Sequence, residues 1–465
     1  MMTRHKHWFV LAWVISTLTV GNSASAISPK APPHVVILLA DDLGWADTGF
    51  NGSDISTPHL DRLAASGVRM NQFYVSPVCT PTRAALMTGR YPIRMGLQCG
   101  VIRPWAMHGL PLDERTLPEA LKEAGYTTAI VGKWHLGHND RSYLPTNRGF
   151  DYQYGHYNGA IDYFKLSRDG GHDWHKNDRR SDDKGYATEL TAREAVSIIE
   201  KHDPKTPLFL YVPFSAPHTP LQAPLKYIDQ YSSITDKKKR VYSAMVSAMD
   251  DAIGKILTQL EKSDYNKDNT LIIFASDNGA LSVIGIGSNG NLRGTKGRLY
   301  EGGVRSPTVI SFGKNLEAGT IHREMVHISD LYPTILNLAG ANLDQEKPLD
   351  GKDLWPTLVE GKPSPHETIL HNVNAYTGAV RVDDWKLVWN GHVSANQTQA
   401  PKHEKWELFN LAQDPLEKIS LADQEPRVFA RLKAKMQTFK KEAVDPTIPP
   451  NTRPDGFKVP EVWGE

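Results

Sequence analysis

The sequence predicts an α/β protein with a large, mixed but mostly parallel sheet flanked by helices, and a small α+β subdomain at the C-terminus. Two observations lead to this prediction. Apolar runs typical of strands alternate with segments that have the apolar spacing of helices, and this order produces parallel sheets. Beyond about Gly361, short strand patterns follow one another and a single helical pattern comes last.

The first predicted strand is residues 34–40, a continuous apolar run that is typical of a parallel strand buried on both faces. Similar runs occupy residues 127–131, 207–212 and 270–275. Their spacing leaves room for helices between them, so we expect these four runs to form the centre of one sheet.

Helices are predicted between these strands. Thr57-Pro58 begins one that ends before Gly67, because Thr before Pro favours helix entry and Gly favours termination. The same signals predict a helix over residues 118–124. Residues 242–260 have the pattern of a long amphipathic helix.

The C-terminal subdomain is assigned to residues 361–465 and the large domain to residues 27–360. The change of pattern predicts short antiparallel strands and one Lys-rich helix, followed by a Pro-rich tail that packs irregularly from Pro446. The predicted strands are 368–371, 378–382, 386–389 and 406–409, and the predicted helix is 428–439.

Residues 1–26 have the three parts of a secretory signal peptide. Arg4 and Lys6 make the start basic, a short apolar core follows, and Ala24-Ser25-Ala26 closes the segment. We expect cleavage after Ala26, export to the periplasm or the medium, and no membrane segment in the mature form.

Composition excludes several classes of protein. The chain is 40% hydrophobic and 23% charged, so it is not a disordered chain. Its 53 Lys and Arg balance 52 Asp and Glu, which gives no basic excess for a nucleic-acid partner. The two cysteines exclude a disulfide framework and a Cys-based zinc module.

Residues that can carry chemistry follow each of the four predicted strands. Ligands in open α/β sheets bind outside the carboxyl ends of strands, so we expect these residues to lie at one edge. They are Asp41-Asp42, Lys133 with His135, His218, and Asp277-Asn278.

The three aspartates and Asn278 offer only oxygen ligands, which suit Ca²⁺ or Mg²⁺ and not zinc or copper. The lysines and histidines nearby, with Lys296, add positive charge and hydrogen-bond donors. Such an array suits a tetrahedral anion, so the reaction class is phosphoryl or sulfuryl transfer.

Cys79 is the candidate nucleophile. Pro81 is placed for a first helical turn, so Cys79 is expected at a helix N-terminus, where negative charge on sulfur is favoured. Cys99, by contrast, fits a small buried hydrophobic residue.

The segment Cys79-x-Pro81-x-Arg83, followed by Leu86-x-Thr88-Gly89-Arg90, resembles the signature of type I sulfatases. In that family the motif cysteine is oxidised to Cα-formylglycine by a formylglycine-generating enzyme. The resemblance implies an alkaline-phosphatase-like fold and a catalytic domain over residues 27–360. Further segments resemble family blocks in the same order, namely 39–44, 132–137, 216–218, 276–279, 293–296 and 406–417.

Within the family, the chain is most similar to the arylsulfatase B branch, the N-acetylgalactosamine-4-sulfatases. Animal members have more cysteines in disulfides, so a bacterial polysaccharide sulfatase is implied. The implied substrate is a 4-sulfate on a galacto-configured sugar of a carrageenan-type galactan or a glycosaminoglycan. The segments that carry this similarity are 57–61, 110–114, 121–128 and 145–151.

The resemblance also implies the roles of single residues. Formylglycine at position 79, hydrated to a gem-diol held by Arg83, attacks sulfur, and its second hydroxyl allows sulfate to be expelled. Asp277 and His135 act as bases, and His218 protonates the leaving alcohol. Lys133 and Lys296 neutralise the sulfate oxygens. One Ca²⁺ is held by Asp41, Asp42, residue 79, Asp277 and Asn278.

Sugar recognition is predicted from aromatic and polar residues in two loops. The candidates are Trp105, Asp162, Tyr163 and His172, because a sugar ring stacks on an aromatic face and its hydroxyls bind polar groups. The basic residues between Lys165 and Arg180 are either a solvated face or contacts for further sulfates of a polymer.

Two other functions stay open at this level. A phosphate or phosphonate ester hydrolase can share the fold, although Cys79 and the single-ion ligand set favour a sulfatase. A non-catalytic protein that binds sulfated glycans is the second, although such a protein is expected to have lost Cys79, Arg83 or the ion ligands, and all are present.

Overall fold

The computed structural model describes residues 31–393, 401–446 and 452–465. The predicted signal peptide lies outside the described residues. Within the ranges that are described, no helix is both long and apolar enough to cross a membrane.

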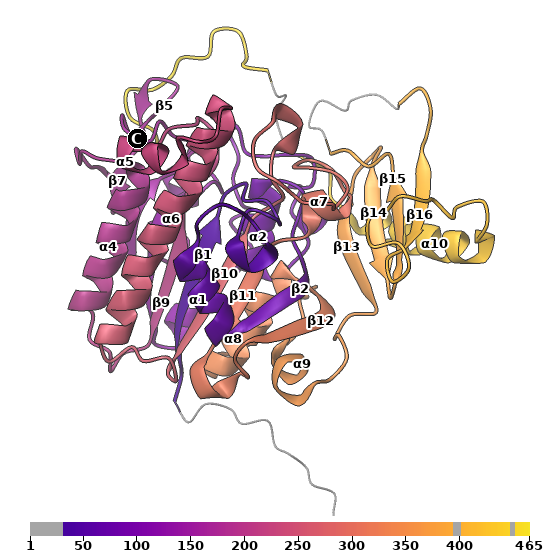
Figure 1. Cartoon of the computed structure of the whole chain (residues 1–465), viewed down its shortest axis with the longest axis horizontal. Coiled ribbons are helices and arrows are strands. Elements are labelled where there is room, and N and C mark those ends of the chain that lie inside the picture. The colour runs from indigo at the N-terminus through magenta and orange to yellow at the C-terminus, as the bar shows by residue number, and fades with distance from the viewer. Residues whose placement is uncertain (1–30, 394–400, 447–451) are drawn as a thin grey trace, which may run out of the picture.

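A ten-stranded sheet forms the body of the protein, in the order β12-β2-β11-β10-β1-β9-β3-β4-β7-β8 (Figure 1). The five strands from β10 to β4 are parallel neighbours, while β11, β7 and β8 add antiparallel pairs. The predicted mixed, mostly parallel sheet is therefore confirmed. The strands are β1 (His34–Ala40), β2 (Val68–Tyr74), β3 (Thr127–Lys133), β4 (Tyr152–His156), β7 (His175–Lys176), β8 (Arg179–Arg180), β9 (Leu208–Pro213), β10 (Thr270–Ser276), β11 (Thr308–Ser311) and β12 (Thr320–His327).

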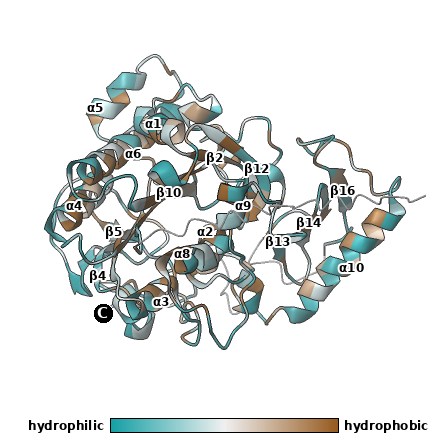
Figure 2. Cartoon of the chain, turned by 90° about the horizontal axis from the view of Figure 1, so that it is seen from below, coloured by the Kyte–Doolittle hydropathy of each residue, from teal (hydrophilic) through white to brown (hydrophobic). Residues whose placement is uncertain are grey.

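Helices cover both faces of this sheet, as Figure 2 shows from below. Successive side chains of β1 point to opposite faces, so Val35, Ile37 and Leu39 join one apolar core and the residues between them join the other. One layer consists of α1 (Pro58–Ser66), α4 (Ala187–Lys201), α5 (Leu225–Ile228) and α6 (Lys237–Lys262), and the other includes α2 (Cys79–Thr88), α3 (Leu117–Glu123) and α8 (Leu331–Ala339).

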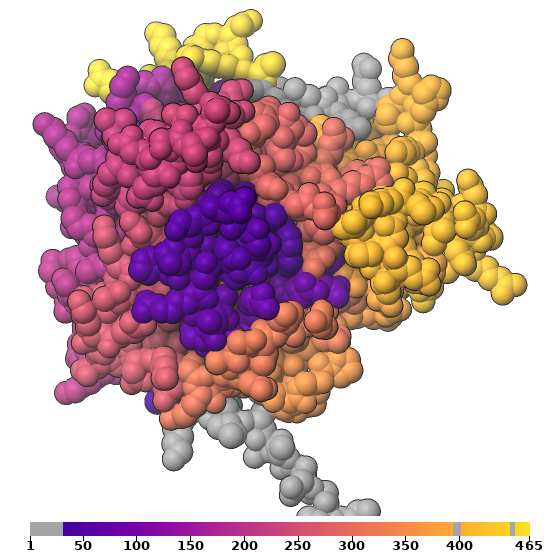
Figure 3. Space-filling view, in the orientation of Figure 1, coloured from indigo at the N-terminus to yellow at the C-terminus, as the bar shows by residue number. Residues whose placement is uncertain are grey.

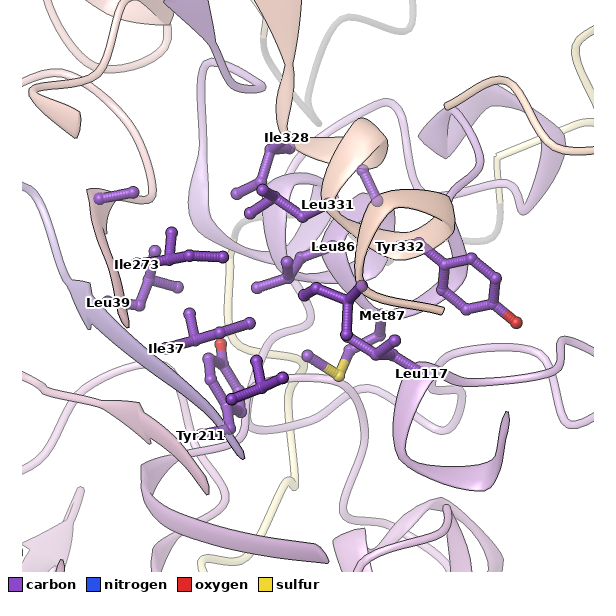
Figure 4. Close-up of a cluster of buried hydrophobic side chains, with 14 of the residues drawn as sticks. Ile37, Leu39, Leu86, Met87, Leu117, Tyr211, Ile273, Ile328, Leu331 and Tyr332 are labelled. Atoms are coloured by element: carbon purple, nitrogen blue, oxygen red, sulfur yellow. The ribbon is translucent and has the colours of Figure 1, made fainter. Parts of the chain in front are cut away.

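Helix α2 is anchored deep in the core. All ten of its residues are buried, which is unusual for a helix whose sequence contains Thr and Arg. Leu86 and Met87 pack among Ile37 of the sheet, Leu117 of α3 and Leu331 of α8 (Figure 4). This packing fixes the position of Cys79, the first residue of the helix.

The C-terminal part forms a second, antiparallel sheet with one helix packed on it, as predicted. In the space-filling view it stands as a lobe at one side of the body (Figure 3). The indoles of Trp389 and Trp406 stack at 5.3 Å between ring centres across two of its strands. Its elements are β13 (Thr368–Val373), β14 (Gly378–Val382), β15 (Trp385–Trp389), β16 (Trp406–Asn410) and α10 (Pro426–Glu442).

A buried ion cluster joins the lobe to the body. Lys386 Nζ of β15 lies 2.9 Å from Glu301 Oε1 and 2.9 Å from Glu417 Oε1. Glu301 begins the short helix α7 (Glu301–Val304), and its backbone N–H donates to Glu417 Oε2 at 2.7 Å. All three side chains are almost completely buried, so the lobe is held against the body by charges that water does not screen.

Candidate active site

Four neighbouring strands bring the predicted chemistry to one edge of the sheet. Strands β10, β1, β9 and β3 are adjacent and parallel, so their carboxyl ends lie side by side. Lys133 is the last residue of β3, and the other groups follow the strand ends within a few residues. The groups are Asp277-Asn278 after β10, Asp41-Asp42 after β1, His218 after β9, and Lys133 with His135 at β3.

Cys79 faces this edge from the first turn of α2. Its Sγ lies 3.4 Å from Asp41 Oδ1, 3.9 Å from Asp42 Oδ1 and 3.3 Å from Lys296 Nζ. Burial raises the pKa of the Cys79 thiol, and the charge of Asp277 raises it further. The structure places Cys79 at the helix N-terminus, as predicted, but burial among carboxylates keeps the unmodified thiol in its neutral form.

Each carboxylate of the site is paired with a cation. Lys133 Nζ lies 2.6 Å from Asp41 Oδ2, and Lys296 Nζ lies 2.6 Å from Asp42 Oδ1. The Nε and Nη2 atoms of Arg83 donate to Asp277 Oδ2 at 3.1 and 2.9 Å, and Nη1 donates to the Lys133 carbonyl. Three buried carboxylates thus balance three buried cations, which lowers the cost of taking these charges out of water.

The three aspartates differ in protonation. Burial raises the pKa of Asp41 to about 7, against the opposing charge of Lys133. Burial acts in the same direction on Asp42, but the charges of Lys296 and His218 outweigh it and lower that pKa. The pKa of Asp277 is also lowered, since the charges of Arg83 and Lys133 outweigh its burial. Asp42 and Asp277 are therefore firmly anionic.

Asn278 shows that the residues present fit a divalent cation. Its Nδ2 donates to Asp42 Oδ1 at 2.7 Å and to the Gly279 carbonyl at 3.0 Å, while its Oδ1 is buried without a hydrogen-bond partner. An unsatisfied buried acceptor costs about 1–3 kcal/mol, which a cation ligated by this oxygen would recover. Ligand atoms of Asp41, Asp42, Cys79 and His218 lie within 4.8 Å of one another. The carboxylates of Asp41 and Asp42 and the amide oxygen of Asn278 are oxygen ligands, which suit Ca²⁺ or Mg²⁺.

His218 is held over Asp42 by the loop after β9. Its Nε2 lies 3.6 Å from Asp42 Oδ2, and its Nδ1 lies 2.6 Å from the Thr219 carbonyl. The hydroxyl of Tyr163 donates to the carbonyls of Ser215 and His218, at 2.6 and 2.8 Å. Burial lowers the pKa of His218 to about 3, with the charge of Asp42 opposing it, so the imidazole is neutral before an anion binds.

His135 is fixed in the neutral form. Its Nε2 lies 3.0 Å from the Ile102 carbonyl and so carries the proton, which leaves the buried Nδ1 as an acceptor without a partner. Burial lowers the pKa of His135 well below its usual value, and the charge of Lys133 lowers it further. Gly159 packs against this ring so closely that a Cβ at position 159 would lie 2.4 Å from Nε2.

A cavity of about 270 Å³ opens onto these groups. Cys79, His135, His218 and Lys296 line it, and so does Arg168, one of the basic residues named from the sequence. Arg103 and His392 also line it and were not predicted. Arg103 comes from the loop after α2, and Arg168 comes from the short strand β5 (Ser167–Arg168). His392 and Val393 come from the loop that follows β15, so the C-terminal lobe forms part of the wall.

The four residues predicted to bind sugar do not line this cavity. Asp162 accepts hydrogen bonds from Gln222 and from the backbone of its own turn, and Tyr163 holds the His218 loop. Trp105 contacts Phe457 edge to face, and His172 contacts the Trp174 carbonyl. Their roles in binding stay predictions.

The sequence pointed to Arg168 but not to the other two polar residues of the cavity wall. Arg168 belongs to the basic run between Lys165 and Arg180, whereas Arg103 and His392 have no local signal. In that run, Lys165, Lys176, Arg179 and Arg180 are exposed and do not line the cavity.

Comparison with known proteins agrees with this geometry. The family model described as Sulfatase matches residues 33–341, more than half of the chain. The chain belongs to the sulfatase family. A second model, described as N-sulphoglucosamine sulphohydrolase, C-terminal, matches residues 295–442. This sulfatase is therefore a sulfuric ester hydrolase, and the predicted family and enzyme class are confirmed.

Its relatives include arylsulfatase J of Mus musculus, which is 38% identical over 93% of this chain and 80% of its own length. The N-acetylgalactosamine-6-sulfatase of the same species is 33% identical over 85% of this chain and 83% of its own length. Among solved structures, Ps i-CgsB in complex with k-i-k-neocarrahexaose has a TM-score of 0.81 and 34% identity, over 90% of this chain and 94% of that chain. The relatives thus share nearly the whole architecture.

Proposed function

We propose that this sulfatase removes a 4-sulfate from a galacto-configured sugar of a sulfated polysaccharide, either a carrageenan-type galactan or a glycosaminoglycan. One observation carries the chemistry: Cys79 stands at the end of a buried helix, facing a cavity, with Lys296 and two aspartates around its sulfur. The similarity to a structure that holds a carrageenan hexaose supports the galactan.

Residue 79 acts as formylglycine in this proposal. The unmodified thiol is buried and neutral, so it is a poor nucleophile where it stands. Conversion to formylglycine by a generating enzyme during maturation supplies two hydroxyl groups after hydration, of which one attacks sulfur and the other allows sulfate to be released. The Cys79-x-Pro81-x-Arg83 motif supports this modification.

The ion site is proposed to hold one Ca²⁺ through Asp41, Asp42, Asp277 and Asn278, together with residue 79. When bound, the ion supplies positive charge that polarises the hydroxyl at position 79 and the sulfate oxygens. Asn278 contributes the buried Oδ1 that has no other partner. Arg83 holds Asp277 in place through two hydrogen bonds to one carboxylate oxygen.

Positive charge for the sulfate comes from two lysines. Lys296 lines the cavity, and its Nζ lies 3.3 Å from Cys79 Sγ. Its ammonium group therefore stands beside the position from which the substrate sulfate is attacked. Lys133 adds a second ammonium group, 2.6 Å from Asp41 Oδ2. These fixed charges favour the transition state, in which negative charge is spread over the oxygens of the transferring group and develops on the leaving oxygen.

Proton transfers are assigned to three residues. His218 lines the cavity beside Lys296 and protonates the leaving alcohol, since a sugar alkoxide is a poor leaving group and a bound sulfate raises the pKa of a nearby imidazole. His135 offers its unpartnered Nδ1 as the base for release of sulfate. Asp277 is the base for the attacking hydroxyl.

Export through the predicted signal peptide would bring the enzyme to the periplasm or the medium, where it meets such polysaccharides.

The preference for a 4-sulfate has one specific competitor. N-acetylgalactosamine-6-sulfatase of Mus musculus is 33% identical over most of the chain, which favours a 6-sulfate as the second candidate.

The test is release of sulfate from matched galacto-configured oligosaccharides that carry one sulfate at position 2, 4 or 6. The proposal predicts the highest kcat/KM for the 4-sulfate. A higher value for the 6-sulfate or for a gluco-configured sugar would overturn the assignment while leaving the sulfatase chemistry intact. Matched phosphate and phosphonate esters should turn over far more slowly.

A further inference from the structure

The cavity has more positive charge than one sulfate ester needs. Of its described lining residues none is acidic, while Lys296, Arg103 and Arg168 are cationic. Lys296 faces Cys79 and therefore the scissile sulfate, which carries a single negative charge. The two arginines are additional, and they come from separate loops of the chain.

Both arginines line the same cavity, and their charges oppose each other. Burial lowers the pKa of the Arg103 guanidinium, and the charge of Arg168 lowers it further. Arg168 forms an ion pair with Asp169 at 3.4 Å, and both side chains are partly exposed, so that pair is weak. Two like charges that converge on a cavity are stabilised when an anion binds between them.

The C-terminal tail holds both arginine loops. Trp463 is almost fully buried; its Nε1 donates to the Arg168 carbonyl at 2.9 Å, and its backbone N–H donates to the His172 carbonyl at 2.9 Å. Phe457 stacks on Trp463 and meets Trp105, two residues beyond Arg103, edge to face. Figure 1 shows this segment, in yellow, running over β5.

The tail is packed too closely to be a loose end. A Cβ at Gly171 would lie 2.3 Å from the Pro460 carbonyl oxygen, so the hairpin of β5 and β6 (Gly171–His172) touches the tail backbone directly. The backbone N–H of His172 also donates to the carbonyl of Glu461 in the tail, at 2.8 Å. The tail therefore sets the position of Arg168 through the backbone, whatever the side chain binds.

From these observations we infer that Arg103 and Arg168 form a second anion subsite, which binds a further sulfate group of the same saccharide beside the scissile one. This inference rests on the proposed function and narrows its substrate to a saccharide that carries two sulfates within the reach of one cavity. The tail residue Trp463 is a positioning residue of this subsite, because it acts through the backbone of Arg168.

The experiment compares two oligosaccharides that differ only in one neighbouring sulfate. The readout is the ratio of kcat/KM for the disulfated and the monosulfated substrate, in wild type, Arg103→Gln, Arg168→Gln and the double variant. We expect each single variant to lower this ratio by about tenfold, as the loss of one charge-assisted hydrogen bond would. Added salt should lower the ratio in wild type and have little effect in the double variant.

Matched variants separate this effect from damage to the fold. Arg62→Gln removes a half-exposed arginine of α1 that does not line the cavity, and its ratio should equal that of wild type. Trp463→Phe removes the hydrogen bond to the Arg168 carbonyl while keeping an aromatic ring, and should lower the ratio partway. Thermal melting of each variant shows whether it is folded.

A double variant that keeps the wild-type ratio, whether or not its activity falls equally on both substrates, would overturn the inference. Failure of the proposed function would look different, because wild type would then release no sulfate from either substrate. A wild-type enzyme that prefers the monosulfated substrate would also contradict the subsite.

Discussion

Lys386→Met should weaken the attachment of the C-terminal lobe. The substitution removes the one ammonium group that lies 2.9 Å from both Glu301 and Glu417, and it leaves two buried carboxylates facing each other. Met has a similar length and no charge, so packing is largely kept. The loss of stability therefore reports on the charges.

The structure sets the size of the effect. At a pH where both carboxylates are ionised, removing one partner from a buried ion pair costs about 3–5 kcal/mol, because the remaining charge stays out of water. Glu301 keeps a hydrogen bond from the Tyr74 hydroxyl at 3.0 Å and the charge of Arg305 at 3.7 Å. Once Lys386 is removed, the Glu417 carboxylate keeps one contact among the described residues, the backbone N–H of Glu301. Most of the cost should therefore come from Glu417.

The effect should depend on pH. Burial and the charge of Glu301 raise the pKa of Glu417 to about 7, against the opposing charge of Lys386, from a usual value of 4.5. The folded state thus binds an extra proton between these values, so the stability from this group is present below pH 4.5 and lost as pH rises through 7. Without Lys386 the carboxyl holds its proton to still higher pH, so the destabilisation should be larger at pH 8 than at pH 6.

Urea unfolding followed by tryptophan fluorescence is a suitable assay, since the stacked pair of Trp389 and Trp406 reports on the lobe. The double variant Lys386→Met with Glu417→Gln is the matched control. It should recover part of the loss, because the unpaired charge is gone. In Lys386→Met, a loss of unfolding free energy below about 1 kcal/mol is typical of an exposed ion pair. Such a loss, or equal losses at pH 6 and 8, would show that the buried charges do not hold the lobe.

Three further substitutions test the site itself. Asn278→Leu removes the buried Oδ1 and should weaken calcium binding, measured by calorimetry. Loss of an outer-shell partner weakens metal binding by about 10–100-fold, and loss of a direct ligand should cost at least as much. Unchanged affinity would contradict the ligand set. Gly159→Ala should lower kcat, since its methyl would meet His135 at 2.4 Å and overpacking costs about 1–3 kcal/mol; wild-type kcat would show that His135 can move. Tyr163→Phe removes hydrogen bonds to the His218 loop, so both kcat and the melting temperature should fall. The expected loss in the free energy of unfolding is about 1 kcal/mol. No change in kcat or in the melting temperature would show that other contacts hold the loop.

The centre of the sheet was predictable because its strands are continuous apolar runs. Residues 34–40 form β1 as predicted, and Asp41-Asp42 follow it directly. Parallel strands bring their carboxyl ends to one edge, so residues far apart in sequence could be placed together without any knowledge of side-chain packing. The prediction that Asp277 lies close to Asp41 depends only on the rule that parallel strands end at the same edge of a sheet.

The edge of the sheet was not predictable in the same way. Strand β2 and strand β12, with the sequences VRMNQFY and TIHREMVH, have no continuous apolar run, and both have side chains that are only partly buried. Strand β2 pairs with β12 on one side and with β11 on the other, and both partners are distant in the chain. Local patterns do not contain such pairings, because strand formation depends on neighbours across the sheet.

The cavity wall was the least predictable part of the site. Trp105 was chosen as a sugar platform, yet it packs on Phe457 of the tail while Arg103, two residues earlier, lines the cavity. Sequence alone does not show which side of an irregular loop faces inward. His392 reaches the cavity only because the C-terminal lobe packs against the Lys296 loop, where the Val393 N–H donates to the Gly297 carbonyl at 2.9 Å.

The central claim is that residue 79 carries the sulfate chemistry as formylglycine. The most direct measurement is peptide mass spectrometry of residue 79 on the same preparations whose sulfate release is assayed, with Cys79→Ser as the matched control. We expect the rate of sulfate release to be proportional to the fraction of chains with formylglycine at position 79, and Cys79→Ser to give no turnover because its single hydroxyl cannot release sulfate. Full turnover from chains that carry only the unmodified thiol would contradict it.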